Sequence, residues 1–331
     1  MRLLKNFSFR RARLSDYYAV TQKLRIVRND WDYLPGVYNE FVASPGRMGF
    51  VALNGNSEIV GAHFGIIVDN GQTLCKRAAR VKENLQGQGI FTRLSEVMDE
   101  EVRRHGMIKW EVKTCAWANA ERVRNGYIQR ANFKELYAME SYDMYLKVSD
   151  ILPVRETSFS NIRPMTHQDL WNIFNDEGIC EKFFPRGRVP SFWVPLRPVE
   201  DNLKHLINCR THIFMSCKSH AKFDPDSKPL GTIKASDISM MSLLFCYTTE
   251  SGFVYNTDLH GQDFSDLESH LKFHLHRLQN VGHESVRWTI MFDSSHKDVI
   301  EERIGHCLKE YGVSLTQKVK SKQDVYFEKM L

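Results

Sequence analysis

The sequence lacks the features that would mark a secreted, disulfide-stapled or membrane protein. Its seven cysteines form no C-x-x-C pair and are odd in number, which favours a reducing, intracellular compartment. The N-terminal stretch MRLLKNFSFR has no apolar core of signal-peptide length, and no run of residues approaches the length of a membrane span. We therefore expect a cytoplasmic protein with no membrane partner.

A long run of basic residues is also missing. The net charge is +5, which gives a mild bias towards anionic ligands and only weak evidence for nucleic acid, so no nucleic-acid partner is expected. The hydrophobic content of 42% and the charged content of 26% are ordinary for a globular protein. At 331 residues the chain suits two domains, each with its own core.

The first half of the chain reads as alternating strands and helices. Residues 7–24 predict a short strand, a turn and a helix, and residues 28–49 are rich in loop signals, with turns at Pro35-Gly36 and Pro45-Gly46. The predicted elements that follow are a hairpin over 49–69, a strand over 72–82, a helix over about 90–105, a strand over 107–117, a short helix over 118–131 and a strand over 135–148.

The second half repeats this pattern. Residues 9–20 and 162–173 align without a gap, and Arg10 and Asp16 match Arg163 and Asp169. Strand, helix, strand, helix and strand are then expected over 251–261, 264–278, 285–293, 296–308 and 324–330. We predict a tandem of two similar domains, 1–150 and 151–331, joined near residues 149–161.

A glycine pair between a strand and a helix is the feature with the clearest chemistry. Gly87 and Gly89 let backbone N–H groups approach an anion, and the helix that follows adds the partial positive charge of its N-terminus. The pattern lacks the GK[ST] of a P-loop and the third glycine of a dinucleotide-binding fold. The second half has Asp258 and Asp263 around the matching turn, and these would repel a phosphate, so only the first half is expected to hold one.

The segment RVKENLQGQGIFTRL resembles motif A (Q/R-x-x-G-x-G/A) of the GCN5-related N-acetyltransferase (GNAT) superfamily, and the order of elements over 7–147 is similar to that fold. Gln86, Gly87 and Gly89 match, whereas Phe91 departs from the last small position. The resemblance implies tandem GNAT-like α/β domains, each with a mixed, mostly antiparallel sheet flanked by helices, the second degenerate. It also implies that acetyl-CoA binds along the residues of the glycine turn, Gln86, Gly87, Gln88, Gly89, Ile90 and Phe91, and between the strands 74–81 and 108–116.

The same resemblance assigns roles at the reacting centre. A backbone N–H of Arg80 or Val81 is the expected donor to the thioester oxygen, and Asn119 is a candidate contact to the cofactor. Tyr127 is the candidate general acid, although it lies one residue from the family's usual position, so that packing is an equal alternative. No general base stands out. Glu111 and His63 are candidates, with a structural role as the alternative for each.

Two further clusters have competing interpretations. His270 and His274 have a spacing that can hold zinc, but without a third ligand a solvated helix face is favoured. The stretch EKFFPRGRVPSFWVPLRP is either a substrate lid, in which Arg186, Arg188 or Arg197 pairs with a carboxylate, or a connecting loop.

The tandem layout with a degenerate second half is most similar to the histidine N-acetyltransferase family. This implies acetyl transfer from acetyl-CoA to the α-amine of a free amino acid, histidine first. Two alternatives stay open: a protein or peptide acceptor, and an acyl-CoA-binding module without turnover. A deep pocket closed by the second half would favour the small amine. The oligomeric state is left open.

Overall fold

A computed structural model describes residues 6–24, 32–104, 106–116, 125–184, 186–217, 234–261, 264–313 and 320–331. The N-terminal half contains β1 (Ser8–Arg11), η2 (Leu14–Asp16), η3 (Ala19–Lys23), α1 (Leu34–Ala43), β2 (Arg47–Leu53), β3 (Ile59–Val68), β4 (Thr73–Val81), η5 (Glu83–Leu85), α2 (Ile90–Arg103), β5 (Trp110–Ala116), η7 (Gly126–Arg130) and β6 (Lys134–Lys147).

The C-terminal half, from residue 148 on, follows a related order. It contains η8 (Val148–Asp150), η9 (Glu156–Phe159), β7 (Ile162–Pro164), α4 (His167–Asn175), α5 (Glu177–Phe183), β8 (Val189–Ser191), β9 (Val194–Leu196), η10 (Glu200–Asn202), α6 (Leu203–Leu206), β10 (Thr211–Cys217), η11 (Ala235–Asp237), β11 (Ile238–Thr249), β12 (Gly252–His260), α7 (Leu267–Gln279), β13 (Ser285–Asp293), η12 (Ser294–His296), α8 (Lys297–Glu310) and β14 (Lys320–Met330). No described helix is long and apolar enough to cross a bilayer.

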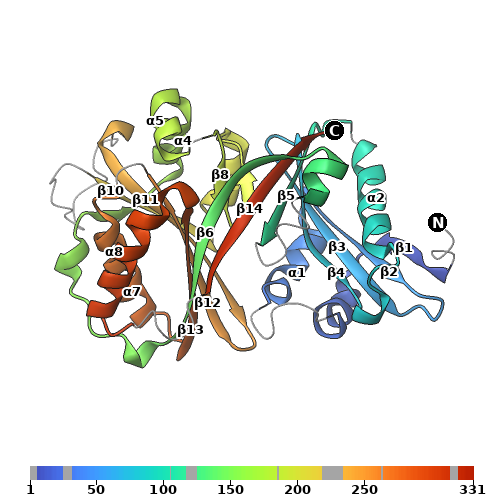
Figure 1. Ribbon diagram of the computed structural model, residues 1–331, viewed down its shortest axis with the longest axis horizontal. Helices are drawn as coiled ribbons and strands as arrows, with labels where there is room; N and C mark the ends of the chain where they lie inside the picture. Colours follow the sequence, from blue (N-terminus) through green and yellow to red (C-terminus); the bar gives the residue numbers. More distant parts are fainter. Residues whose placement is uncertain are drawn as a thin grey trace.

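Twelve of the described strands form one sheet in which the halves exchange their last strands, and β8 and β9 form a separate two-stranded sheet. The order is β1-β2-β3-β4-β5-β14-β6-β13-β12-β11-β10-β7. The last strand of the C-terminal half, β14, therefore pairs with β5, and the last strand of the N-terminal half, β6, pairs with β13. Figure 1 shows β6 and β14 running between the two halves. Because of this exchange, residues near the C-terminus lie beside the centre of the N-terminal half.

The helices divide the core into clusters. One cluster packs α2 onto β2–β4, and another packs α7 and α8 onto β11–β13. A third joins α1 of the N-terminal half to α4, α5 and α6 of the C-terminal half, with Phe41, Phe64, Phe184 and Phe245 among its members. The tandem α/β architecture predicted from the sequence is present, but the halves share one apolar cluster, where the sequence suggested a separate core for each.

The internal repeat has a physical counterpart in each half. Arg10 donates to both carboxylate oxygens of Asp16, at 2.7 and 2.9 Å. In the second copy, Arg163 lies 3.6 Å from Asp169, which also caps the start of α4. The two matched pairs therefore tie the first strand of each half to the turn that follows it.

Two interpretations of the sequence were wrong. The loop signals at Pro35 and Gly36 lie in the first turn of α1, where proline is tolerated because that turn's N–H groups have no partner within the helix. His270 and His274 are fully buried rather than solvated. His274 shares hydrogen bonds of 2.8 Å with Ser242 and Tyr255, and His270 meets the same Ser242, so α7 buries a polar network. Among the described residues no group of side chains is arranged to hold a metal ion.

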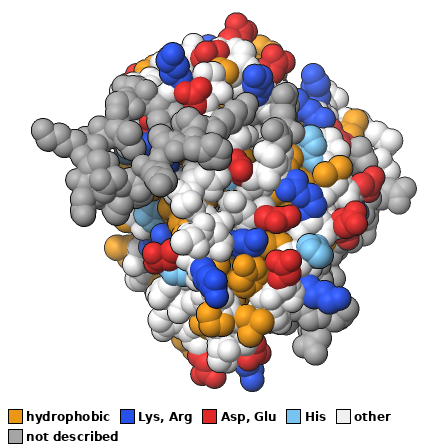
Figure 2. All heavy atoms as spheres, turned by 90° about the vertical axis from the view of Figure 1, so that its left-hand side faces the viewer, with side chains coloured by type: hydrophobic (Ala, Val, Ile, Leu, Met, Phe, Trp, Pro, Cys, Tyr) orange, Lys and Arg blue, Asp and Glu red, His pale blue; other side chains and the backbone are white. Residues whose placement is uncertain are grey.

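The surface of the C-terminal half is mixed in charge. Figure 2 views this side of the molecule, and it shows acidic and basic side chains interspersed over the visible coloured surface. Alternating signs of this kind are typical of a solvated face rather than of an electrostatic footprint for a polyanion.

Candidate active site

The glycine turn opens directly into the start of α2. Gly87 and Gly89 have left-handed φ angles of 79° and 81°, and no atom lies within 4 Å of where a Cβ would stand on either residue. Gly89 is also the N-cap of α2. The turn borders a groove of about 430 Å³, lined by Ala79, Arg80, Val81, Leu85, Gln86, Gly87, Gly89, Ile90, Phe91 and Thr92. Backbone N–H groups and a helix N-terminus therefore face open space, which suits an anion.

The groove contains most of the residues predicted to bind the cofactor, and Gln88 lies in the same turn. Ile90 is buried against the sheet, so its contribution to the groove comes from the first turn of α2. Phe91, the departure from the motif, packs against His63 with ring centroids 5.0 Å apart. Asn119 lies outside the described residues.

The strands β4 and β5 part beyond their first residues. They pair in parallel only at Thr73, Leu74 and Cys75, and the rest of β4 has no register partner on β5. On its other edge, β4 carries a bulge, since Ala62 faces Arg80 while Phe64 faces Arg77. Ala78, inside the bulge, has a φ of 49°. Because β4 has no partner on β5 beyond Cys75, its backbone groups on that edge face the opening between the two strands.

The hydrogen-bond parity of β4 indicates which way its backbone points. Lys82 donates its N–H to the Val60 carbonyl of β3 at 2.9 Å. Successive residues of a strand face opposite edges, so the N–H of Val81 points away from β3, towards the opening beside β5. Of the two predicted donors, the N–H of Val81 is thus directed into the opening. Arg80 lies opposite Ala62 and directs its N–H towards β3.

A second cavity, of about 200 Å³, lies over the bulge and is called the bulge cavity here. Its lining comes from both halves: Asp32, Tyr33, Lys76, Arg77, Ala78, Ala79, Arg80 and Thr114 from the first, Trp193 and Asp324 from the second. It shares Ala79 and Arg80 with the groove of the glycine turn. The groove of the glycine turn and the bulge cavity are therefore neighbours along β4.

The two acidic side chains of the bulge cavity have different partners. Asp32 forms a buried ion pair with Arg80 at 2.6 Å. Asp324, on the exchanged strand β14, accepts a hydrogen bond of 3.0 Å from the indole N–H of Trp193, and is 5% exposed. A carboxylate that lines the cavity lies within reach of a molecule bound there, so Asp324, carried in by the exchanged strand, is a candidate proton acceptor.

The aromatic, proline-rich stretch forms a two-stranded hairpin, β8–β9, whose tip is Phe192 and Trp193. Both tip residues have left-handed φ angles, 46° and 59°. The carbonyl of Trp193 accepts from the hydroxyl of Thr114 at 2.8 Å, and the Phe192 ring stacks on Phe245. The hairpin tip therefore forms a wall of the bulge cavity and bridges the two halves.

The arginines predicted to meet a substrate carboxylate already contact protein groups. Arg186 donates to the Leu136 carbonyl at 2.8 Å, Arg188 is paired with Glu328, and Arg197 pairs with Glu328 at 2.9 Å. Arg77 differs from these three. Its guanidinium lies over the rings of Tyr33 and Phe192, 5.3 and 4.6 Å from their centroids, and within the described part of the chain no carboxylate pairs with it.

Glu111 lies beneath α2 in a cluster of charges. Its carboxylate is 2.9 Å from Lys76 and 3.0 Å from Lys113, and it is 2% exposed. Burial alone raises the pKa of Glu111, but the ion pairs with Lys113 and Lys76 outweigh it, and the net pKa is lowered. A carboxylate held between two ammonium groups is a weak base, so this geometry favours a structural role.

Glu111→Gln is expected to destabilise the fold by about 3 kcal/mol at pH 7, because it leaves buried ammonium groups without their counter-charge. The lowered pKa means that the carboxylate stabilises the fold above its ordinary value of 4.5, and that this contribution is lost as the pH falls through the folded-state value. Denaturant unfolding at pH 7 and pH 4 should show the gap between variant and wild type narrowing at the lower pH. A gap that is constant with pH would rule out the ion-pair explanation.

The other two candidates for proton transfer are buried or packed. The Tyr127 ring lies 5.4 Å from those of Phe133 and Phe327, with the Lys113 ammonium 5.0 Å from its centroid. Its role as general acid stays a prediction. His63 is buried, and burial, followed by Lys76 and Lys113, lowers its pKa to about 3, so its imidazole is neutral at pH 7.

The corresponding region of the second half is narrower. There β12 and β13 stay paired over six positions, from Phe253 to Asp258, twice the three of β4 and β5. Asp258 is buried at the end of this ladder, and burial raises its pKa to about 8. Beyond this ladder the described residues Leu259, His260 and Gly261 line a cavity of only about 30 Å³, so the second half has a much smaller opening than the first.

Arg77, Trp193 and Asp324 were not singled out from the sequence as site residues. Arg77 lies three residues before Arg80, on the strand that leads into motif A. The resemblance could therefore have indicated Arg77 as a site residue. Trp193 stood in a stretch with two competing interpretations. For Asp324 the sequence held no local signal, since only the strand exchange brings residue 324 beside β5.

Comparison with known proteins bears directly on this geometry. Residues 158–294 match the family model described as histidine N-acetyltransferase, C-terminal. The structure is similar to a GCN5-related N-acetyltransferase from Sphaerobacter thermophilus, with 12% identity, a TM-score of 0.55, and coverage of 98% of this chain and 96% of that one. The chain has the GNAT fold and is related to the histidine N-acetyltransferases. The family match and this acetyltransferase fold together support an N-acetyltransferase enzyme.

A second GNAT-fold likeness extends over both halves. The N-myristoyltransferase of Saccharomyces cerevisiae, solved with bound myristoyl-CoA, has 12% identity and a TM-score of 0.56, with coverage of 99% of this chain and 83% of that one. A sequence search of curated proteins gives no match. The family match lies in the C-terminal half, whereas the glycine turn lies in the N-terminal half, so the two observations are independent.

Proposed function

We propose that this GNAT protein transfers the acetyl group of acetyl-CoA to the α-amine of a small free amino acid, with L-histidine the first candidate. The observation that carries the proposal is that the groove of the glycine turn and the bulge cavity adjoin on β4, with Ala79 and Arg80 common to both. The family match to histidine N-acetyltransferases supports the choice of acceptor. The cysteine pattern of the sequence makes the cytoplasm our proposed location.

From the glycine turn to the bulge, the residues of the opening suit the successive parts of an acyl-CoA. The glycine turn and the N-terminus of α2 would hold the pyrophosphate, because their N–H groups and helix dipole favour an anion. The pantetheine arm would run between β4 and β5, where the backbone of β4 has no partner strand. The thioester would then lie at the bulge, with the N–H of Val81 available to its carbonyl oxygen.

In the proposed reaction the amine nitrogen bonds to the thioester carbon, and the carbon–sulfur bond breaks. The Val81 N–H stabilises negative charge on the carbonyl oxygen as the bond forms. The proton lost by the amine passes to Asp324, which lines the same cavity. The thiolate of CoA regains a proton on leaving, and Tyr127 remains our candidate for supplying it.

The acceptor's carboxylate needs a cation close to the reacting centre. The α-amine and α-carboxylate of an amino acid are attached to one carbon, so a group that binds the carboxylate must lie beside the bulge. Arg77 and Arg80 line this cavity, and Arg80 is paired with Asp32. We therefore assign the carboxylate to Arg77, whose planar guanidinium suits bidentate binding.

Arg77→Gln is expected to raise the KM for the amino acid by about 10- to 100-fold, the size of a lost charged hydrogen bond. The KM for acetyl-CoA should not change, because the glycine turn is intact. The control is an acceptor whose carboxylate is replaced by a carboxamide. Wild type should discriminate strongly against this amide, and the variant should not. Equal discrimination by both proteins would remove Arg77 from the acceptor site.

The proposal is tested by incubating the purified protein with acetyl-CoA and a mixture of free amino acids, following thiol release and identifying products by mass. Acetylated histidine is the expected product. The closing of the bulge cavity by the hairpin tip supports a small acceptor over a peptide. Thiol release with peptides alone would favour the peptide alternative. If acetyl-CoA binds but no thiol is released with either amino acids or peptides, the protein is an acyl-CoA-binding module without turnover.

A further inference from the structure

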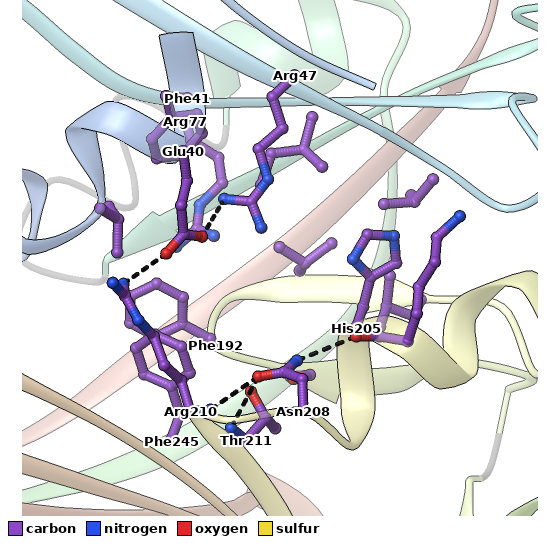
Figure 3. A pocket seen from close by; sticks show the side chains of 17 residues that line it. Glu40, Phe41, Arg47, Arg77, Phe192, His205, Asn208, Arg210, Thr211 and Phe245 are labelled. Carbon is purple, nitrogen blue, oxygen red and sulfur yellow. Dashed lines mark hydrogen bonds and ion pairs between the residues drawn. The ribbon is translucent and has the colours of Figure 1, made fainter. Parts of the chain in front are cut away.

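A third cavity lies between the halves, on the far side of Arg77 from the bulge cavity. It is bounded by α1 and β2–β4 of the first half and by the β8–β9 hairpin, α6 and β11 of the second, with a volume of about 100 Å³. Figure 3 shows Arg47, Arg77, Glu40, His205 and Arg210 arranged around it. We name it the interhalf pocket. Arg77 also lines the bulge cavity, so one side chain belongs to both.

The charges of the interhalf pocket do not balance. Glu40 pairs with Arg47 at 3.0 Å and with Arg210 at 2.7 Å, so one carboxylate serves two guanidiniums (Figure 3). Arg77 adds a third guanidinium, held by aromatic rings rather than by a carboxylate. Three positive charges against one negative charge leave an excess of two on these four side chains.

The pKa values of two lining groups reflect this excess. Burial lowers the pKa of Arg47, and the charges of Arg77 and Arg210 lower it further against the opposing effect of Glu40. Burial, with Lys204 and Arg47, lowers the pKa of His205 to about 4. His205 is thus a neutral hydrogen-bonding group at pH 7, and an anion entering the pocket would reduce the repulsion among the guanidiniums.

Part of the remaining wall of the interhalf pocket is apolar, while Ser191, Lys204, Asn208 and Thr211 add polar groups. The apolar part includes Phe41, Ile66, Val68, Val194 and Leu196, all of which contribute to the shared core. A ligand that suits both walls carries a carboxylate at one end and an uncharged, partly apolar body at the other. An ammonium group on the ligand would be repelled by the guanidiniums, so a free amino acid is a poor fit. Acylation of the amine removes that charge.

The interhalf pocket is not the place for the reacting acceptor. Arg47 and Arg210 line it but do not line the bulge cavity. An amino acid whose carboxylate met those two residues would hold its amine on the wrong side of Arg77 and Phe192. The two cavities therefore suit different ligands, and they are coupled through the one guanidinium they share.

We propose that the interhalf pocket is a second binding site, for an N-acylated amino acid or a similar small carboxylate without an ammonium group, and that its occupancy weakens acceptor binding by drawing Arg77 away from the bulge cavity. The source of the ligand rests on the proposed function, since N-acetyl amino acids would be the products of that reaction. The binding site itself does not, because its charge and shape are independent of turnover.

The test is the equilibrium affinity of N-acetyl-L-histidine, measured by calorimetry at constant ionic strength. Arg210→Ala is expected to weaken binding by about tenfold, because one charged hydrogen-bond donor is lost. Glu40→Gln is expected to tighten it by a similar factor, because the competing carboxylate is removed. Arg93→Ala, which removes an exposed arginine of α2 paired with Glu96 and Glu100, is the control and should leave affinity unchanged.

Opposite shifts in the two pocket variants are the decisive result, since a folding defect cannot tighten binding. N-acetyl-L-histidine amide, which lacks the carboxylate charge, should bind at least about tenfold more weakly to the wild type. Acetate carries the charge but has no apolar body, so it tests the two requirements separately. If acetate binds as tightly as N-acetyl-L-histidine, the site accepts any small carboxylate, and the assignment to acylated amino acids is wrong.

The proposal is wrong if the wild type does not bind N-acetyl-L-histidine, or if neither Arg210→Ala nor Glu40→Gln changes its affinity. Steady-state kinetics test whether the interhalf pocket and the acceptor site are coupled. N-acetyl-L-histidine should raise the KM for the acceptor in wild type, and less so in Arg210→Ala. A wild type that binds this ligand but never releases thiol would defeat the proposed function and leave the site intact. Thiol release by the wild type, together with an unchanged affinity for N-acetyl-L-histidine in both pocket variants, would support the proposed function and defeat the second binding site.

Discussion

Gly89→Glu should abolish acetyl-CoA binding, with a dissociation constant raised by on the order of 100-fold or more. A left-handed φ of 81° costs a residue with a Cβ about 1–2 kcal/mol. The added carboxylate would also stand at the N-terminus of α2, where it would compete with the pyrophosphate for the same N–H groups and repel its charge. The measurement is a calorimetric titration of the variant with acetyl-CoA.

The matched control for Gly89→Glu is Gly106→Glu. Gly106 also has a left-handed φ, of 67°, and open space where a Cβ would stand, but it follows the other end of α2. Both variants carry the same backbone strain and the same added charge. If Gly106→Glu weakens acetyl-CoA binding as much as Gly89→Glu does, the loss is a general effect on α2 and the glycine turn is not the phosphate site.

Asp324→Asn should lower kcat by about 100- to 10,000-fold at neutral pH, the range for loss of a general base. Asparagine preserves the shape of the side chain and can accept the Trp193 indole hydrogen bond, but it takes no proton from the amine. The affinity for acetyl-CoA should be retained, because Asp324 does not line the groove of the glycine turn. The measurements are steady-state thiol release over a range of pH and a separate acetyl-CoA titration.

Asp258→Asn is the control for Asp324→Asn. Asp258 is a buried carboxyl on β12 that accepts from the Phe192 N–H of the same hairpin, and burial raises its pKa to about 8, so it is largely protonated at pH 7. Asparagine should therefore replace it with little change in kcat. Equal losses in the two variants would show that both act by positioning the hairpin tip, and proton transfer would then not depend on Asp324.

The sequence was sufficient for the elements that local pattern determines. The glycine turn, the helix that follows it and the strand before it were predicted because Gly87 and Gly89 interrupt an apolar periodicity that changes from a period of two to one of 3.6. The matched pairs Arg10–Asp16 and Arg163–Asp169 were visible as a repeat and are contacts in the structure. A local signal in these cases corresponds to a local contact.

The wrong predictions came from weighing local signals too heavily. Pro35 and Gly36 read as turn residues, but Leu34, Val37, Tyr38 and Phe41 have helical spacing and are all buried. The apolar periodicity outweighs the loop propensity of two residues in a first turn. His270 and His274 read as solvated because histidine is polar, yet within the core Ser242 and Tyr255 hydrogen-bond both ring nitrogens of His274, and Ser242 also bonds Nδ1 of His270.

What the sequence could not supply is the composition of the bulge cavity. Asp324 reaches β5 only because β14 crosses into the first half, and no local pattern in the sequence indicates that exchange. Trp193 reaches Thr114 only because the hairpin tip inserts between the halves. The contacts join residues 79 and 131 positions apart in the chain, beyond the range of periodicity.

In the proposed mechanism, the acyl donor and the amino-acid acceptor meet over the bulge of β4, in a cavity completed by the C-terminal half. The most direct test is the affinity of a conjugate in which CoA and L-histidine are joined through an acetyl bridge, compared with that of CoA alone. Because the conjugate occupies both cavities and resembles the reacting complex, it should bind at least about 100-fold more tightly than CoA. A conjugate that binds no more tightly than CoA would show that no acceptor site adjoins the thioester, and the proposed mechanism would fail.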